Sequence, residues 1–151
     1  MSDHILDTDH ASLFQRGHPQ VVAHVLAHPA DRLVVTIVTV EEQLRGRLSQ
    51  VRRASSGLSR IQAYARLHEL VDFFSEVRIL DFDTVANTRY EALRQQRIRI
   101  GIQDLRIAAI VLSVSGISVT RNAGDFRQTP DLPIEDWSHP SSHLFARYPQ
   151  Q

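Results

Sequence analysis

The stretch Leu33-Val-Val-Thr-Ile-Val38 decides the fold class. All six of its residues are aliphatic or β-branched, which is typical of a strand buried on both faces of a parallel sheet. The next residues, Thr39-Val-Glu-Glu42, fit a capping box with Thr39 as the N-cap and Glu42 at N3, and predict a helix toward Ala54. A buried strand followed directly by a helix is the repeating unit of parallel α/β proteins, so this segment predicts that class.

The same alternation continues on both sides of that unit. A capping pattern at Ser59 and Gln62 predicts the start of a long helix, Asp83 is a predicted N-cap, and Gly116 is a predicted C′ glycine that ends the helix before it. Further strands are predicted at residues 5–6, 77–82, 117–120 and 132–137, and further helices at 19–28 and 103–115. We therefore expect one α/β domain over residues 1–137 with a mainly parallel five-stranded sheet, followed by a flexible tail at 138–151.

The composition narrows the possible chemistry. The 17 basic residues are all Arg, the 17 acidic residues balance them, and there is no Cys. The absence of Lys excludes Schiff-base enzymes and a phosphate-binding loop with its Lys, and the absence of Cys excludes disulfides, thiol nucleophiles and Cys-bound zinc. No apolar run reaches the roughly 20 residues of a membrane span, and the first residues lack a secretory pattern, so we expect a cytoplasmic protein.

Four acids stand beside predicted strand ends. Asp7 follows the first strand, Glu42 lies in the helical turn after the second, Asp104 begins the helix before the fourth, and Asp125 follows the fourth. Functional groups gather at the carboxyl edge of a parallel sheet, and converging carboxylates are stabilised by a divalent cation such as Mg²⁺. Each acid alone also has a structural alternative, because Glu42 could complete a capping box and Asp104 could complement a helix dipole.

Specific strings carry a family resemblance. They are Ile5-Leu-Asp-Thr-Asp9, Thr39-Val-Glu-Glu-Gln-Leu-Arg-Gly46, Asp104-Leu-Arg-Ile-Ala-Ala109, Val119-Thr-Arg-Asn-Ala-Gly-Asp-Phe126 and Leu132-Pro-Ile-Glu-Asp-Trp137. In this order the strings resemble the motifs of VapC-type PIN domains, the toxin ribonucleases of toxin–antitoxin pairs. The resemblance implies a three-layer α/β/α sandwich, Mg²⁺ or Mn²⁺ dependence, RNA cleavage, a VapB-like antitoxin and a homodimer.

The resemblance also implies roles for individual residues. Asp7, Glu42, Asp104 and Asp125 would form the catalytic set, with Asp7, Asp104 and Asp125 as metal ligands. Asn122 stands where many relatives carry Asp, which leaves a second metal open. Thr39 and Thr120, together with Thr8, could orient ligands or water or could be ordinary strand-end hydroxyls, and for Thr8 we favour the ordinary role.

Arginines surround the third and fourth acids, and Arg recognises phosphate with two hydrogen bonds. We expect an RNA-binding rim drawn from this group, about half of which should be merely solvated: Arg94, Arg97, Arg99, Arg106, Arg121 and Arg127.

Alternatives to the nuclease remain open. Asp7-Thr-Asp9 also resembles haloacid-dehalogenase phosphatases, although Ala11 stands where their motif has Thr or Val. A binding module that keeps the fold without catalysis is a third candidate, because Asn122 removes one charge. His24 and His28 have a zinc-compatible spacing that the polar side of an amphipathic helix explains better.

Overall fold

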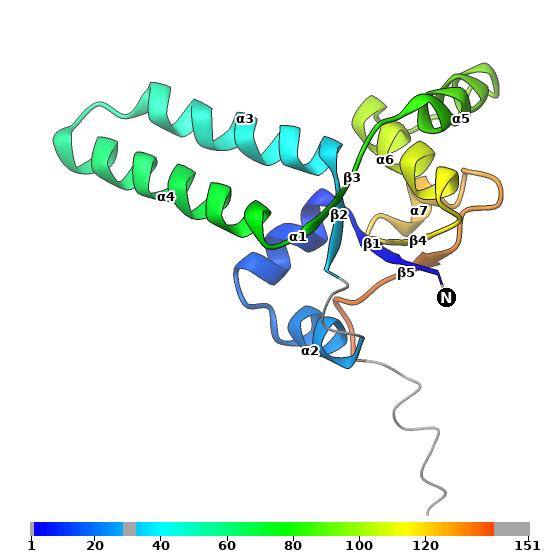
Figure 1. Ribbon diagram of the computed structural model, residues 1–151, viewed down its shortest axis with the longest axis horizontal. Helices are drawn as coiled ribbons and strands as arrows, with labels where there is room; N and C mark the ends of the chain where they lie inside the picture. Colours follow the sequence, from blue (N-terminus) through cyan, green and yellow to red (C-terminus); the bar gives the residue numbers. More distant parts are fainter. Residues whose placement is uncertain (1, 29–32, 141–151) are drawn as a thin grey trace, which may run out of the picture.

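The computed structural model describes residues 2–28 and 33–140 (Figure 1). Its sheet has five strands in the order β3-β2-β1-β4-β5, and every neighbouring pair is parallel. The predicted α/β class is confirmed, with an entirely parallel sheet. The strands are β1 (His4–Leu6), β2 (Val34–Thr36), β3 (Arg78–Leu80), β4 (Ile117–Val119) and β5 (Ile134–Glu135).

Helices cover both faces of the sheet, which makes the predicted three-layer sandwich. Neighbouring residues of β1 point to opposite sides: Ile5 joins a core with α5 and α6, whereas Leu6 joins a core with α1, α2 and α4. The helices α3 and α4 form an antiparallel hairpin that projects from the sheet on the left of Figure 1. The helices are α1 (Thr8–Gln15), α2 (Pro19–Ala27), α3 (Ile37–Arg53), α4 (Gly57–Ser75), α5 (Thr84–Gln95), α6 (Ile102–Ser113) and α7 (Ala123–Phe126).

The predicted boundary between β2 and α3 is wrong. The strand ends at Thr36, which is itself the N-cap, and its hydroxyl oxygen accepts a hydrogen bond from the Thr39 backbone N–H at 3.3 Å. Thr39 therefore lies inside the first turn, and Glu42 lies beyond the position a capping box requires. An apolar run cannot show by itself where a strand becomes a helix, because Val38 is buried in either conformation. The capping explanation for Glu42 is thereby removed.

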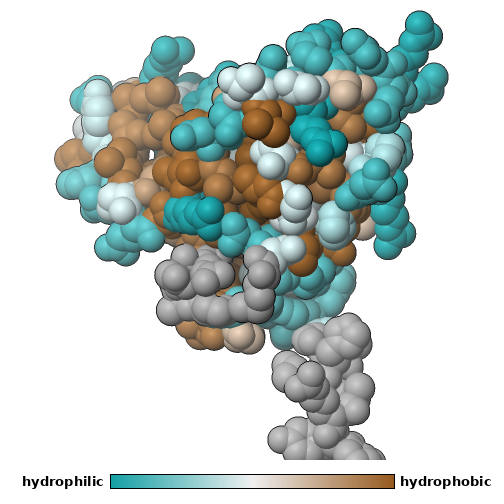
Figure 2. Space-filling model, turned by 45° about the vertical axis from the view of Figure 1, so that its right-hand side comes forward, coloured by the Kyte–Doolittle hydropathy of each residue, from teal (hydrophilic) through white to brown (hydrophobic). Residues whose placement is uncertain are grey.

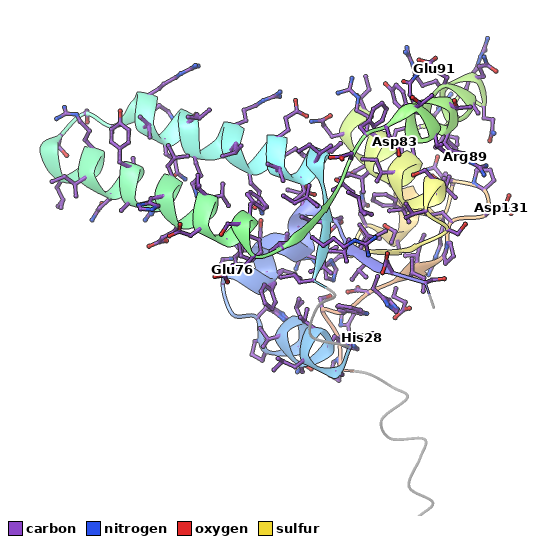
Figure 3. The ribbon with its side chains drawn as sticks, viewed as in Figure 1. His28, Glu76, Asp83, Arg89, Glu91 and Asp131 are labelled. Atoms are coloured by element: carbon purple, nitrogen blue, oxygen red, sulfur yellow. The ribbon has the colours of Figure 1, made fainter. Side chains whose placement is uncertain are left out.

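Two other helix ends differ from the prediction. The N-cap of α4 is Ser56, which forms a capping box with Ser59, so the helix begins one turn before the predicted pair of Ser59 and Gln62. At the end of α6 the left-handed residue is Ser115, with a φ of 53°, rather than Gly116. Gly116 is needed for space, because a Cβ there would lie 2.6 Å from Ile5 Cδ1. The predicted N-cap Asp83 is confirmed at the start of α5, where its carboxylate accepts from the Ala86 N–H (Figure 3).

Two helices were not predicted. The sequence of α1 contains many polar residues, although His10, Ala11 and Leu13 are buried in it. The helix α7 is a single short turn after β4. Within residues 2–28 and 33–140 no helix is long and apolar enough to cross a bilayer. The last part of the predicted tail, residues 141–151, lies outside the described residues, and the tail stays a prediction.

Candidate active site: an acid cluster at the strand ends

The strand order places the site. Connections run from β1 toward β2 and β3 on one side, and β4 and β5 lie on the other side, so β1 and β4 flank the point where the winding direction changes. Ligand sites of open parallel sheets lie outside the carboxyl ends of the strands at this point. Asp7 follows β1 there, and its backbone N–H donates to Val119 O of β4 at 3.0 Å.

Three of the four predicted acids, Asp7, Glu42 and Asp104, line one hollow at this edge, whereas Asp125 is not among its lining residues. Its volume is about 500 Å³, and it is lined by Asp7, Thr8, Asp9, Glu42, Asp104, Arg121 and Asn122. Asp7 comes from the end of β1, Glu42 from α3 and Asp104 from the first turn of α6. The fold therefore brings together residues that are distant along the chain. Glu42 follows Asp7 by 35 positions (42 − 7), and Asp104 follows Glu42 by 62 positions (104 − 42).

The pKa of Asp104 is affected by all three of the other predicted acids. Partial burial raises its pKa above the usual value for Asp, and the negative charges of Asp7, Glu42 and Asp125 raise it further. A hydrogen bond from the Asn122 side chain opposes this rise. The carboxylates thus repel one another across a short distance, which is the electrostatic condition that a bound cation relieves.

Asp7 is the most enclosed member of the cluster, with 5% of its surface exposed. It is also the N-cap of α1, because its Oδ1 accepts from the His10 backbone N–H at 2.8 Å. This hydrogen bond holds the carboxylate at the sheet edge, where it lines the hollow.

Glu42 is held by the hydroxyl of Thr8, for which the sequence favoured an ordinary strand-end role. Thr8 Oγ1 donates to Glu42 Oε1 at 2.7 Å and lies 3.0 Å from Thr39 Oγ1. Thr39 is fully buried, so the three side chains tie the start of α1 to α3. The useful sequence signal for Thr8 was its place directly after Asp7, at the end of a strand.

The fourth motif closes the other side of the hollow. Asn122 Nδ2 donates to Asp125 Oδ2 at 3.0 Å, and the Asn122 backbone N–H donates to the buried Thr120 hydroxyl at 2.9 Å. Asn122 thereby interacts with both Asp125 and Asp104, and Thr120 holds the backbone of Asn122 through its hydroxyl oxygen.

Arg121 and Asp9 form an ion pair at the rim. The guanidinium makes two hydrogen bonds to the carboxylate, at 2.6 and 2.9 Å, and Asp9 raises the pKa of Arg121 further. Asp9 was not among the predicted site residues. Its position two residues after Asp7 places it in the first turn of α1, a helix that the sequence did not predict.

Distances alone suggest a second set of metal ligands. One ligand atom each from Asp7, Asp9 and His10 lie within 4.8 Å of one another. Asp9 is already neutralised by Arg121, however, and His10 Nε2 accepts a hydrogen bond from the Trp137 backbone N–H. Asp7 belongs to both sets, and the charge repulsion on Asp104 favours the set of Asp7, Glu42, Asp104 and Asp125.

Only Arg121 of the six predicted rim arginines lines the hollow. Arg94 and Arg106 lie over the ring of Tyr90, with guanidinium carbons 5.7 and 5.6 Å from its centroid. The remaining three, Arg97, Arg99 and Arg127, are exposed.

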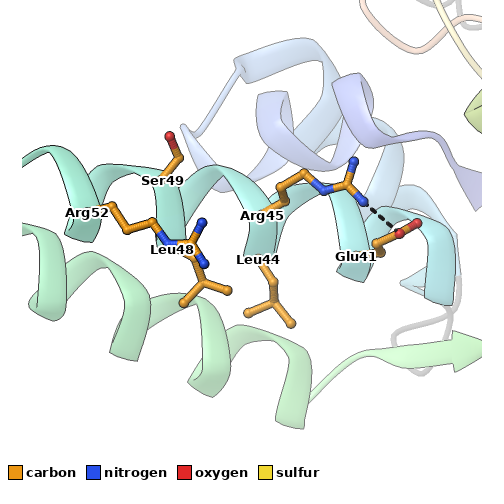
Figure 4. Close-up of a pocket in the computed structure, with 6 residues that line it drawn as sticks. All are labelled: Glu41, Leu44, Arg45, Leu48, Ser49 and Arg52. Atoms are coloured by element: carbon orange, nitrogen blue, oxygen red, sulfur yellow. Dashed lines mark hydrogen bonds and ion pairs between the residues drawn. The ribbon is translucent and has the colours of Figure 1, made fainter.

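A larger hollow along α3 is not the acid site. Figure 4 shows Leu44 and Leu48 between Arg45 and Arg52, around a space of about 640 Å³. Its one acid, Glu41, pairs with Arg45 at 3.0 Å. A single neutralised carboxylate offers no repulsion for a cation to relieve.

Sequence comparison agrees with this geometry. A family model described as the PIN domain matches residues 5–132. The chain belongs to the PIN-domain family. A relative from Haemophilus influenzae strain R2866, named Ribonuclease VapC1, is 30% identical over 139 residues, which is 89% of this chain and 98% of the relative. Ribonuclease VapC2 of Rickettsia felis is 33% identical over 69 residues, covering 43% of this chain and 52% of that one.

Solved PIN-domain structures share the fold. The structure of FitAcB from Neisseria gonorrhoeae superposes with a TM-score of 0.69 at 26% identity and covers 90% of this chain and 99% of that chain. VapBC-1 from nontypeable Haemophilus influenzae gives 0.67 at 25% identity, with 90% and 98% covered. DNA-bound VapBC from Salmonella typhimurium gives 0.72 at 24% identity, with 91% and 99% covered, and supports the fold alone.

Proposed function

We propose that this PIN-domain protein is a metal-dependent endoribonuclease and the toxin of a toxin–antitoxin pair. The observation that carries the proposal is the convergence of Asp7, Glu42 and Asp104 on one hollow at the carboxyl edge of the sheet, and the raised pKa of Asp104 is consistent with it. The relatives named as VapC ribonucleases support RNA as the substrate. Cleavage of cellular RNA would take place in the cytoplasm.

The donor set fits a hard divalent cation. Carboxylate and amide oxygens are preferred by Mg²⁺ and Mn²⁺, and the cluster supplies no sulfur ligand because the chain has no Cys. Asp7, Asp104 and Asp125 would hold the ion, and the amide oxygen of Asn122 could complete the set. The bound ion would lower the pKa of a water molecule and offset negative charge on the phosphate.

The surrounding residues would orient the reacting groups. Thr8 fixes one oxygen of Glu42, so the carboxylate is directed for a water molecule or a ligand in the hollow. Thr39 supports Thr8, and Thr120 holds the Asn122 backbone. A water molecule would attack phosphorus and the ester bond to the leaving oxygen would break. The attacking water's proton would pass to a carboxylate or to solvent, and the leaving oxygen would take a proton from solvent to become a hydroxyl group.

The rim arginines would bind the RNA backbone. Arg121 is the first candidate because it lies beside the acids, and its pair with Asp9 is exposed enough to exchange for phosphate. The other five would extend the contact only as far as they face the same strand of RNA. Arg94 and Arg106 already pack on Tyr90, which favours a structural role over RNA binding for those two.

A groove beside α1 and α4 suits the antitoxin. Two hollows of about 680 and 660 Å³ share Phe14 and Phe73 as walls. One end carries arginines and the other is apolar. Arg16, Arg47 and Arg66 line the first end, and Val25, Leu26 and Leu33 line the second. A VapB-like segment with apolar side chains followed by acids would match both ends.

The expected homodimer also needs an apolar surface. Figure 2 shows a broad hydrophobic area bordered by hydrophilic residues. Large apolar side chains of α3, α5 and α6 are exposed, namely Ile37, Leu48, Val85 and Ile102. Exposed apolar surface commonly marks protein interfaces, and we propose that these four side chains contact a second copy of the chain.

The test is RNA cleavage by the purified protein. Mixed RNA is incubated with Mn²⁺ and the unaltered chain, the Asp104→Asn variant, or the unaltered chain with a chelator. We expect cleavage only in the first reaction. Cleavage that survives either control overturns metal-dependent catalysis. RNA binding without cleavage would identify a binding module, and phosphate release from a small ester would identify a phosphatase.

Antitoxin docking has its own test. The chain is co-expressed with the small DNA-binding protein expected from an adjacent reading frame, and co-purification is measured. Leu26→Asp should abolish co-purification, because Leu26 lines the apolar end of the groove and is 78% exposed, so the substitution places a charge on that surface. Leu58→Asp is the matched control, since Leu58 is 68% exposed and lines neither hollow. Equal loss in both variants, or in neither, contradicts the groove.

A further inference from the structure

His10 is a histidine with no exposed surface that lies between the acid cluster and the last strand. Its Nε2 accepts a hydrogen bond from the Trp137 backbone N–H at 3.2 Å. On the other edge of the ring, Nδ1 is buried without a well-aligned hydrogen bond to the described residues, and Asp7 Oδ1 lies 3.3 Å from it. A fully buried ring nitrogen that has no hydrogen-bond partner in the described part of the chain and lies 3.3 Å from a carboxylate oxygen needs an explanation.

The Trp137 contact determines which nitrogen carries the proton. A backbone N–H can only donate, so Nε2 must offer its lone pair, and the neutral ring then carries its hydrogen on Nδ1. Asp136 Oδ1 lies 3.5 Å from Nε2 but already accepts from the Ser138 N–H and hydroxyl at 2.8 and 2.6 Å. The Nδ1–H therefore lies on the edge of the ring that is next to Asp7, with Nδ1 3.3 Å from Asp7 Oδ1.

This tautomer excludes His10 as a metal ligand. A nitrogen that bears hydrogen has no lone pair for a cation, and the other nitrogen is occupied by Trp137. The short distances among Asp7, Asp9 and His10 follow from their neighbouring places at the start of α1, where the His10 backbone N–H donates to Asp7 Oδ1.

We propose that His10 is a positioning residue that orients Asp7 for the divalent ion. The inference rests on the proposed metal-dependent function. Asp7 Oδ1 accepts from the His10 backbone N–H at 2.8 Å, and Nδ1 of the same residue lies 3.3 Å from that oxygen, which leaves Oδ2 for the ion. Hydrogen bonds to metal-binding carboxylates commonly change metal affinity by about 10-fold to 100-fold. Through Nε2 the same ring connects Asp7 to the backbone that follows β5.

Two conservative variants separate the edges of the ring. In His10→Asn the amide nitrogen takes the place of Nδ1 and can donate to Asp7, whereas in His10→Gln the amide oxygen takes the place of Nε2 and accepts from Trp137. The dissociation constant for Mn²⁺ is measured by calorimetry and Tm is measured without metal. We expect both variants to lose stability, with Mn²⁺ binding about tenfold weaker in His10→Gln and little changed in His10→Asn.

His68→Gln is the control, because His68 is exposed on α4 and pairs only with the exposed Asp72. Mn²⁺ binding that is unchanged in His10→Gln, or that falls equally in both variants in step with Tm, overturns the positioning role alone. Absence of Mn²⁺ binding by the unaltered chain overturns the proposed function together with it.

The tautomer is measured on the unaltered chain by ¹⁵N NMR, so the inference does not depend on a variant that folds. The chain has 8 histidines, and the His10 signals are those missing from the spectrum of either variant. We expect a hydrogen on Nδ1 and a lone pair on Nε2. The opposite tautomer overturns the inference.

Discussion

Thr8 donates its hydroxyl hydrogen to Glu42 across 2.7 Å and thereby joins the first turn of α1 to α3 beside the acid cluster. The contact is possible because β2 ends at Thr36 and α3 begins early, so Glu42 lies in the second turn. Glu42 therefore does not complete a capping box with Thr39. It forms a contact within the proposed active site instead.

Thr8→Val should slow RNA cleavage by about tenfold, because a hydrogen bond to a charged group contributes about 1.5–3 kcal/mol. Valine keeps the shape of threonine but cannot donate, so Glu42 loses its orientation. The rate constant at saturating RNA is the measurement. Thr88→Val on α5 is the control, since its hydroxyl donates only to Thr84 O in the same helix. Equal rates in Thr8→Val and the unaltered chain would contradict the role of this contact.

Asp104→Asn should raise Tm of the metal-free protein at neutral pH. Because folding raises the pKa of Asp104, its contribution to stability is complete below the unfolded pKa and is lost as pH rises through the folded pKa. At neutral pH the ionised carboxylate therefore destabilises the fold, and asparagine removes that charge. Calorimetry in chelator from pH 4 to pH 8 should show the two melting curves converging in acid.

Asp81→Asn is the control for the pH series of melting curves, because Asp81 is exposed. Mn²⁺ should also raise Tm of the unaltered chain and leave Asp104→Asn nearly unchanged, because a ligand that binds the folded state stabilises it. A neutral-pH Tm that falls in Asp104→Asn would show that the carboxylate is stabilising and that the repulsion is absent.

Arg121→Gln should raise KM for RNA by about tenfold, since it removes a charged hydrogen-bond donor at the rim. It also frees the Asp9 carboxylate, which then repels phosphate. Steady-state cleavage at fixed salt measures the effect, and Arg89→Gln on α5 is the control (Figure 3). An unchanged KM would remove Arg121 from the RNA-binding rim.

Gly116→Ala should destabilise the fold by about 1–3 kcal/mol, the usual cost of overpacking. A Cβ at this position meets Ile5 Cδ1 at 2.6 Å and the Asp3 carbonyl oxygen at 3.2 Å. Gly46→Ala is the opposite case, because nothing lies within 4 Å and the residue is inside α3, so alanine should stabilise by about 0.5–1 kcal/mol. Urea denaturation of both variants checks the pair, and a stable Gly116→Ala would contradict the close packing of β1 on β4.

The sequence predicted the sheet and the positions of the acids because both depend on local patterns. Buried strands such as Val34–Thr36 consist of β-branched residues, and Asp7 and Asp104 stand at fixed places beside apolar elements. Helix starts were predicted less well, since Thr36 and Thr39 offer the same hydroxyl and only the backbone decides which one caps.

His10 and Thr8 could not be assigned from sequence for a different reason. The helix that carries them reads as a polar cluster, and the partners that define their roles are distant along the chain. His10 meets Trp137 across 127 positions, and Thr8 meets Glu42 across 34. Such contacts depend on tertiary packing rather than on local propensity.

The most direct measurement is a crystal structure with Mn²⁺ and its anomalous difference density. We predict one peak within about 2.5 Å of carboxylate oxygens of both Asp7 and Asp104. A peak held by Asp9 and His10 instead, or no peak at the acid cluster at millimolar Mn²⁺, would contradict the metal site on which the proposed nuclease depends.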